Sequence, residues 1–190
     1  MNKNFEILSL IIRERRAIYP QFFEKGQIED QLIYSILENG RWAPTHKKTQ
    51  PWRFKIFKED ELGRLSEFLG QYYKETTLSS EFSEMKMKKA GEKAIQSAIV
   101  IGLCIERSPE TVIPAWEETA AVACAVQNIW LSCTSLGIGS YWSSPSAIKK
   151  LPEYFGFHEG IECMGLFYMG WMKKDYQGEG VRKSLEEILL

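Results

Sequence analysis

Apolar residues recur at helical spacing in several separate stretches of the chain. Intervals of three and four residues place these side chains on one face of an α-helix. The stretches are residues 5–15, 28–39, 59–74 and 85–93, followed by a long alanine-rich stretch over residues 114–136. Proline is favoured in the first turn of a helix, so Pro114 suits the start of the last one. Gly40 is a candidate stop for the helix predicted over residues 28–39.

Other stretches carry the patterns of β-strands. In residues 52–57, Trp52, Phe54 and Ile56 alternate with other residues, which places them on one side of a strand. Residues 98–105 form an unbroken run of apolar and small residues, which predicts a buried strand. Further strands are predicted through Tyr141 and Trp142 and over residues 161–171. A short helix is predicted between them, at residues 145–151.

The order of these elements predicts one domain over residues 1–190 with an α+β fold. Its helices are expected to form layers against a mixed β-sheet, because each apolar helix face needs a surface to cover it. The tail, residues 172–190, is polar until it closes on an apolar end. That end consists of Leu185, Ile188, Leu189 and Leu190. It also needs a surface to bury it, and a neighbouring subunit is one candidate.

Composition narrows the classes of function. The chain has 24 basic and 25 acidic residues, a net charge of -1, whereas nucleic-acid-binding proteins usually carry a basic excess. We therefore expect no nucleic-acid partner. Residues 119–136 contain no charge and are about long enough to span a membrane. However, their alanine content, Gln127 and Asn128 favour packing inside the protein or across a subunit interface, so no membrane association is expected.

Motifs of several enzyme classes are absent. The four cysteines lie far apart in apolar runs, which is typical of reduced thiols in a cytoplasmic protein. With only two histidines, no histidine–cysteine cluster has the spacing of a metal site. The chain also lacks a G-x-G-x-x-G fingerprint, a P-loop and a G-x-S-x-G nucleophile motif. Since its side chains are poorly equipped for catalysis alone, a cofactor is expected.

Four segments could bind such a cofactor, and each also has a purely structural explanation. Arg15, Arg16 and Ala17 end the first predicted helix, where they either complement the helix dipole or hold a phosphate. The polar loop at residues 43–52 is either a proline-braced connection or a source of donors for the edge of a ring. Residues 136–145 either cap the long helix or allow backbone to approach a ligand. Residues 180–188 are either a solvated tail or part of the site.

Taken together and in this order, these segments resemble the nitroreductase family, over about residues 11–188. The most specific segments are Arg15-Arg16-Ala17, the loop from Ala43-Pro44 to Gln50-Pro51-Trp52, and Arg182-Lys183-Ser184-Leu185-Glu186-Glu187-Ile188. Val126-Gln127-Asn128 and Leu136-Gly137-Ile138-Gly139 are also typical. Within the family, the loop is most similar to that of the compact, minimal nitroreductases, where a histidine occupies the place of His46.

The resemblance implies a three-layer sandwich, with a central mixed β-sheet flanked by helices, that forms an interlocked homodimer. Two FMN sites would lie at the subunit interface, with the alanine-rich helix at the dimer centre and the tail wrapped around the partner. The implied activity is an FMN-dependent oxidoreductase of the cytoplasm. Hydride would pass from NADH or NADPH as co-substrate, through FMN, to a small acceptor such as a nitroaromatic or quinone.

The resemblance also assigns residues to FMN binding. Arg15, Arg16 and Ala17 would hold the phosphate and ribityl region, and Arg182 would add a second phosphate contact. Trp42, His46 and Gln50 would approach the ring or the ribityl chain, with the other subunit as a candidate source. Trp142, Ser143 and Ser144 would close the flavin from the remaining side. The scheme requires no side-chain acid or base, so no catalytic residue and no metal ligand are assigned.

Several positions depart from the family pattern and leave alternatives open. Ala17 replaces the usual serine, Tyr19 stands where lysine or arginine is common, and Lys48 stands where many members carry asparagine. Ser143 occupies a position that is arginine in the most similar minimal relatives. The alternatives are a protein that stores or senses flavin without turnover, and a flavin enzyme of this fold with a specialised reaction. The physiological acceptor and the choice between NADH and NADPH are left open.

Overall fold

Helices form at each stretch with helical spacing. The computed structural model describes residues 2–110 and 112–190 of the chain. Its α-helices are α1 (Lys3–Glu14), α2 (Asp30–Arg41), α3 (Asp60–Thr76), α4 (Glu84–Ile95), α5 (Ala115–Ser135) and α6 (Leu151–Phe155). Short 3-10 turns lie at η1 (Pro20–Phe22), η2 (His46–Lys48) and η3 (Ser146–Lys150). The short helix predicted at residues 145–151 is therefore split between η3 and α6.

Gly40 does not end α2, contrary to the prediction. It lies inside the helix, which continues to Arg41. A Cβ atom at this position would come within 2.9 Å of Ile129 Cγ1 on α5. Glycine is present here because α2 and α5 pack too closely to admit a side chain, rather than because the chain has to turn.

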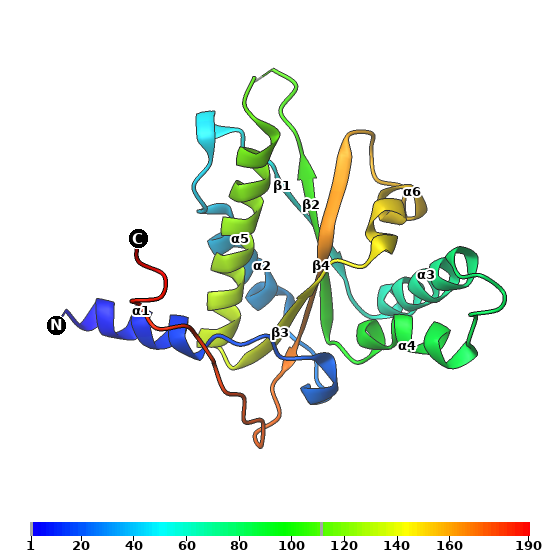
Figure 1. Cartoon of the computed structure of the whole chain (residues 1–190), viewed down its shortest axis with the longest axis horizontal. Coiled ribbons are helices and arrows are strands. Elements are labelled where there is room, and N and C mark those ends of the chain that lie inside the picture. The colour runs from blue at the N-terminus through cyan, green and yellow to red at the C-terminus, as the bar shows by residue number, and fades with distance from the viewer. Residues whose placement is uncertain (1, 111) are drawn as a thin grey trace.

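The β-sheet contains β1 (Trp52–Phe57), β2 (Ile99–Glu106), β3 (Ile138–Ser143) and β4 (Ile161–Trp171), in the order β1-β2-β4-β3. Every adjacent pair of these strands is antiparallel, which corrects the predicted mixed sheet. The physical reason is visible in Figure 1, where α3 runs outward from β1 and α4 runs back. Because a pair of antiparallel helices returns the chain to the end it left, β2 must run against β1.

Helices cover both faces of the sheet, so the fold has three layers and is α+β, as predicted (Figure 1). On one face, α2 and α5 pack against the sheet through a core that includes Ile33, Ile129 and Leu103. On the other face, the region around α3, α4 and α6 forms a second core, which includes Leu65 and Leu151. Within the described residues, no helix is both long enough and apolar enough to cross a membrane.

The first helix and the tail extend away from these layers. Figure 1 shows α1 projecting from the body with the C-terminal segment alongside it. None of the residues of α1 is buried, although Phe5, Leu8 and Leu10 are apolar. The apolar end of the tail is exposed as well, including Leu185 and Leu189. A helix of this length is marginal in water without a packing partner. In a single chain, the apolar side chains of α1 and of the end of the tail are therefore left unburied.

Candidate functional site

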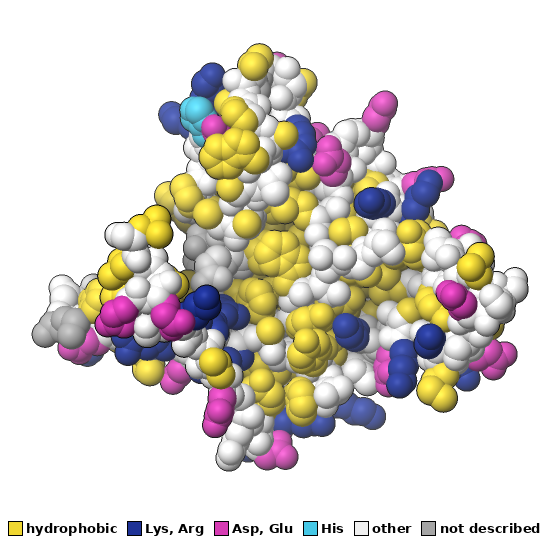
Figure 2. Space-filling model, in the orientation of Figure 1, with side chains coloured by type: hydrophobic (Ala, Val, Ile, Leu, Met, Phe, Trp, Pro, Cys, Tyr) yellow, Lys and Arg dark blue, Asp and Glu magenta, His cyan; other side chains and the backbone are white. Residues whose placement is uncertain are grey.

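Three arginines gather where α1 joins the body of the molecule. Burial, followed by the nearby charges of Arg182 and Arg16, lowers the pKa of Arg15. The arginine ion pairs within the described residues involve Arg41, Arg53 and Arg107 instead, so no carboxylate offsets this cluster. Figure 2 shows basic side chains at the base of α1, beside apolar side chains that gather in the middle of the same face. The arrangement favours an anionic ligand.

Contacts from α5 and the tail position the arginines. The Cζ atom of Arg15 lies 4.7 Å from the centre of the Trp130 ring, a cation–π contact that leaves the edge of the guanidinium open. The Trp130 indole donates a hydrogen bond to the Arg16 carbonyl over 3.1 Å. Arg16 in turn donates to the Gly178 carbonyl and so fastens the tail to the end of α1.

Close packing at Gly180 brings the tail near Arg16. A Cβ atom at Gly180 would lie 2.6 Å from the Arg16 guanidinium carbon, so a side chain here would displace the end of the Arg16 side chain. The tail segment that carries Arg182 is thereby held beside Arg15 and Arg16. The structure thus brings together the three arginines that were predicted to bind phosphate, from segments far apart in the sequence.

The end of β3 adjoins this cluster. The Ile18 amide donates a hydrogen bond to the Ser140 carbonyl, so the segment after Ala17 runs beside β3, which leads to Trp142, Ser143 and Ser144. The Trp142 indole N–H is shielded from solvent and has no acceptor among the described residues. A buried donor without an acceptor costs about 1–3 kcal/mol. This one packs against Gly165 on β4, where a Cβ atom would lie 2.2 Å from it.

Lys93 brings a further positive charge to this region. Its ammonium nitrogen lies 4.7 Å from the centre of the Tyr141 ring and 5.8 Å from that of Tyr19. Lys93 and Ser143 also line one cavity of about 290 Å³. Nothing in the sequence distinguishes Lys93, because α4 carries several lysines. Trp130 could not be recognised either, since a tryptophan in an apolar helix indicates core packing.

The loop that carries His46 and Gln50 is strained. Lys47, Lys48 and Gln50 have φ angles of 48°, 57° and 46°, in the left-handed region that costs a residue other than glycine about 1–3 kcal/mol. The Gln50 amide donates a hydrogen bond to the Thr45 hydroxyl over 3.1 Å, which holds the turn. The Nδ1 atom of His46 is hydrogen-bonded to the Glu117 carboxylate on α5. Strain of this kind is concentrated at functional sites.

The loop that carries His46 lies at the opposite end of α5 from Arg15. The partner of His46 is Glu117, near the start of the helix, whereas the partner of Arg15 is Trp130. At 1.5 Å per residue, these two positions are about 20 Å apart along the helix. Figure 1 shows the loop at one end of α5 and the base of α1 at the other. Trp42 is 77% exposed and follows Asn39, which hydrogen-bonds to Asn128 and Ser132 near Trp130. One chain therefore does not bring the His46 loop to the arginines.

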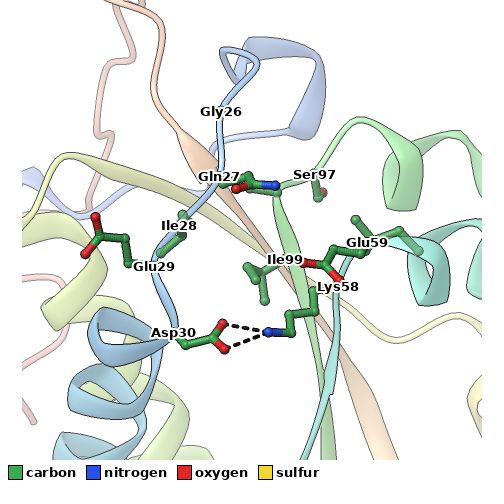
Figure 3. Close-up of a pocket in the computed structure, with 11 residues that line it drawn as sticks. Gly26, Gln27, Ile28, Glu29, Asp30, Lys58, Glu59, Ser97 and Ile99 are labelled. Atoms are coloured by element: carbon green, nitrogen blue, oxygen red, sulfur yellow. Dashed lines mark hydrogen bonds and ion pairs between the residues drawn. The ribbon is translucent and has the colours of Figure 1, made fainter.

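A separate cavity of about 540 Å³ lies between the start of α2, the start of α3 and the turn before β2 (Figure 3). Its lining includes Glu29, Asp30 and Glu59, and the Lys58 ammonium is already paired with both Asp30 oxygens at 2.7 Å. None of the predicted flavin residues lines it. Because its carboxylates repel an anion, this cavity does not suit a phosphate-bearing cofactor.

Comparison with known proteins finds chains similar in sequence and in fold. An Escherichia coli K12 protein named as a candidate NAD(P)H nitroreductase, YdjA, is 27% identical over 168 residues, which cover 87% of each chain. A candidate nitroreductase from Desulfovibrio desulfuricans, solved in complex with FMN, has a TM-score of 0.75 at 21% identity, over 100% of this chain and 96% of that one. The FMN-dependent nitroreductase NfnB from Mycobacterium smegmatis, solved with NADPH, has a TM-score of 0.79 at 15% identity, over 99% of both chains.

The family itself is identified by a match that covers most of the chain. The two solved structures agree in fold with the three-layer arrangement described above. Residues 12–171 match the model of the nitroreductase family, from the end of α1 to the last residue of β4. The chain therefore belongs to the nitroreductase family.

Proposed function

We propose that the protein is an FMN-dependent NAD(P)H oxidoreductase that works as a homodimer and reduces a small acceptor such as a nitroaromatic or a quinone. Family membership supports the reaction class, and the relatives crystallised with FMN and NADPH support the choice of cofactor and co-substrate. The single observation that carries the proposal is the cluster of Arg15, Arg16 and Arg182, which lacks a carboxylate partner within the described residues.

The arginine cluster fits the phosphate of FMN. A phosphate carries close to two negative charges at neutral pH, and guanidinium groups match its oxygens in bidentate fashion. Burial, and then repulsion from Arg182 and Arg16, lowers the pKa of Arg15, and such an anion would relieve the repulsion. Ala17 offers only backbone to this site, so the arginines supply most of the binding free energy at the phosphate.

The end of β3 suits the ring of the cofactor. Trp142 offers an aromatic ring there, and Ser143 and Ser144 follow it in the chain with hydroxyl donors. Lys93 would place a positive charge beside Tyr141, which packs on the other side of β3 from Trp142. When bound, FMN would supply the hydride chemistry, which takes on negative charge that nearby cations and donors stabilise. The side chains need only bind, orient and shield, so no side-chain acid or base is assigned.

The site is complete only with a second copy of the chain. The His46 loop would be supplied by the partner, because in one chain the Glu117 partner of His46 lies about 20 Å along α5 from Trp130, which holds Arg15. Trp42 and Gln50, which flank this loop, would come from the partner with it. The exposed apolar side chains of α1 and the tail would be buried in the same interface. Obligate dimers bury large apolar surfaces of this kind.

The test begins with the visible absorption spectrum of the purified protein before and after addition of FMN. We expect bound flavin, and steady oxidation of NADH or NADPH when a quinone is added as acceptor. A preparation that takes up no FMN would overturn the whole proposal. A protein that binds FMN, whose flavin is bleached by NADPH or dithionite but never turns over with an acceptor, would instead identify a protein that stores or senses flavin.

A further inference from the structure

Cys104 and Cys163 face each other across two neighbouring strands. In the antiparallel pairing of β2 with β4, these two residues are direct partners. Leu103 and Ile105 point into the core beneath α2 and α5, so Cys104 between them points to the opposite face. Cys163 packs against the core on that opposite face, beside α3 and α6. Both thiols therefore lie on the same side of the sheet.

The two thiols interact but differ in access to solvent. Interaction with the Cys163 side chain, and then burial, raise the pKa of the Cys104 thiol, so Cys104 keeps its proton. Cys104 is 1% exposed, whereas Cys163 is partly exposed. A reagent from solvent thus reaches Cys163 first, and Cys104 is the nearest group that can react with the product.

The backbone beside the pair is irregular. The register of β2 against β4 shifts between Leu103 and Cys104, as in a β-bulge. Directly opposed residues on antiparallel strands have Cβ atoms about 4.5–5.5 Å apart. A disulfide requires about 3.5–4.5 Å, so the strands must close slightly, and a bulge is where a ladder is easiest to adjust.

We propose that Cys104 and Cys163 form a reversible cross-strand disulfide when the protein meets hydrogen peroxide. The Cys163 sulfur attacks one peroxide oxygen, the O–O bond breaks, and a sulfenic acid and water result. The Cys104 sulfur then attacks the sulfenic sulfur, the S–O bond breaks, and a second water leaves with the Cys104 proton. Two thiols lose two electrons in total, and the peroxide gains them. A dithiol reagent reverses the reaction by exchange.

The other two cysteines provide internal controls. Cys124 is exposed on α5 and Cys133 is buried in the same helix, and neither is the register partner of a cysteine in the described sheet. Peroxide is therefore expected to link only Cys104 to Cys163 within one chain. The new bond would close a loop of about 60 residues, which restricts the unfolded chain and raises the thermal midpoint of the oxidised form.

The experiment uses the full chain with Cys124→Ser, which prevents links between molecules through that exposed thiol. Folded protein is treated with hydrogen peroxide, alkylated, and digested without reduction for mass spectrometry. We expect one peptide pair joined through Cys104 and Cys163, its loss on treatment with dithiothreitol, and a higher melting midpoint before that treatment. Cys104→Ser should stop at a sulfenic acid that dimedone traps on residue 163, and Cys163→Ser should leave Cys104 unoxidised.

Several results would overturn the proposal. These are a sulfinic acid at Cys163 with Cys104 still alkylated, a link that involves Cys133, or an oxidised form that melts at or below the reduced form. A fully alkylated protein after exposure to peroxide, under conditions that oxidise the same chain in urea, would overturn it as well. None of these readouts depends on bound flavin, so they do not rest on the proposed function.

Discussion

Arg15 is the member of the arginine cluster whose environment is most unusual. It lies against Trp130, next to two like charges, and burial contributes most to the lowering of its pKa. We predict that Arg15→Ala weakens FMN binding by about 10- to 150-fold. The reason is that the substitution removes a charge-assisted hydrogen bond, which is worth about 1.5–3 kcal/mol. Titration of the apoprotein with FMN, followed by flavin fluorescence, measures the change.

The apoprotein provides a check on this prediction. The loss of the cation–π contact with Trp130 costs about 0.5–1 kcal/mol, and relief of repulsion from Arg182 and Arg16 offsets part of it. The variant should therefore unfold at nearly the same denaturant concentration as the wild type. Arg64→Ala is the matched control, because Arg64 is exposed and lies over Phe155 in a different part of the molecule. Equal FMN affinity in both variants would show that Arg15 does not contribute to FMN binding.

The Cys133 thiol makes the free energy of unfolding depend on pH in the alkaline range. Burial in α5 raises the pKa of this thiol from 9.0 to about 12. Above pH 9 the unfolded chain releases the thiol proton while the folded chain keeps it, so stability falls as pH rises from about 9 to about 12. By pH 10.5 this group alone should account for a loss of about 2 kcal/mol.

The comparison variant is Cys133→Ala, which removes the titrating group. Urea unfolding at several values between pH 8 and 10.5, with reductant present, should give a shallower decline for the variant than for the wild type. Other groups with raised pKa values, such as Tyr168, remain in both proteins and do not affect the difference. Parallel curves for the two proteins would show that Cys133 does not titrate as its burial requires.

At the scale of elements, α5 is the helix on which the proposed dimer depends. One side of it packs into the core, while positions 116, 120, 124 and 127 are exposed at helical spacing. Cys124 lies in the middle of that exposed stripe, and the side chains around it are small or uncharged. We predict that Cys124→Arg weakens the dimer by about 100-fold or more, because a charge placed in an apolar interface without a partner costs several kcal/mol.

Sedimentation velocity over a range of protein concentrations measures this effect. Gln71→Arg on α3 is the control, since Gln71 is also exposed but lies on a helix outside the proposed interface. Circular dichroism should show that both variants keep their helices. A Cys124→Arg protein that sediments as the wild type does would place the subunit interface elsewhere.

The sequence predicted the elements well because their periodicity is local. The strands predicted over residues 52–57 and 161–171 have the same bounds as β1 and β4. The mixed sheet was wrong because strand direction depends on how α3 and α4 pack together, which periodicity does not encode. Gly40 was misassigned for a similar reason, since its role is set by Ile129 on another helix. Properties that depend on contacts between distant segments could not be predicted from local pattern.

The same limit applies to the candidate site. Arg15, Arg16 and Arg182 could be grouped only through resemblance to a family, because no spacing rule joins residues at opposite ends of a chain. The structure brings these arginines together and leaves His46 apart from them. Lys93 and Trp130 could not be selected at all, since their neighbours Tyr141 and Arg15 belong to other elements.

At the scale of the whole molecule, this separation leads to a test of the composite site. Let one chain carry Arg15→Ala and a second chain carry both His46→Ala and Gln50→Ala. If each flavin contacts Arg15 of one subunit and the His46 loop of the other, a mixed dimer has one site with all the changes and one site with none. Such a dimer should bind about one FMN, whereas each parent homodimer should retain little.

Different affinity tags on the two chains allow the mixed dimer to be isolated after co-expression, and its flavin content is then compared with both parents. If all the contacts came from one chain, each site of the mixed dimer would carry one lesion, and neither would bind. Recovery of flavin in the mixed dimer alone therefore requires that the site cross the interface. Because α5 keeps Glu117 and Trp130 about 20 Å apart, the rigid helix that separates the half-sites in one chain makes the second chain necessary.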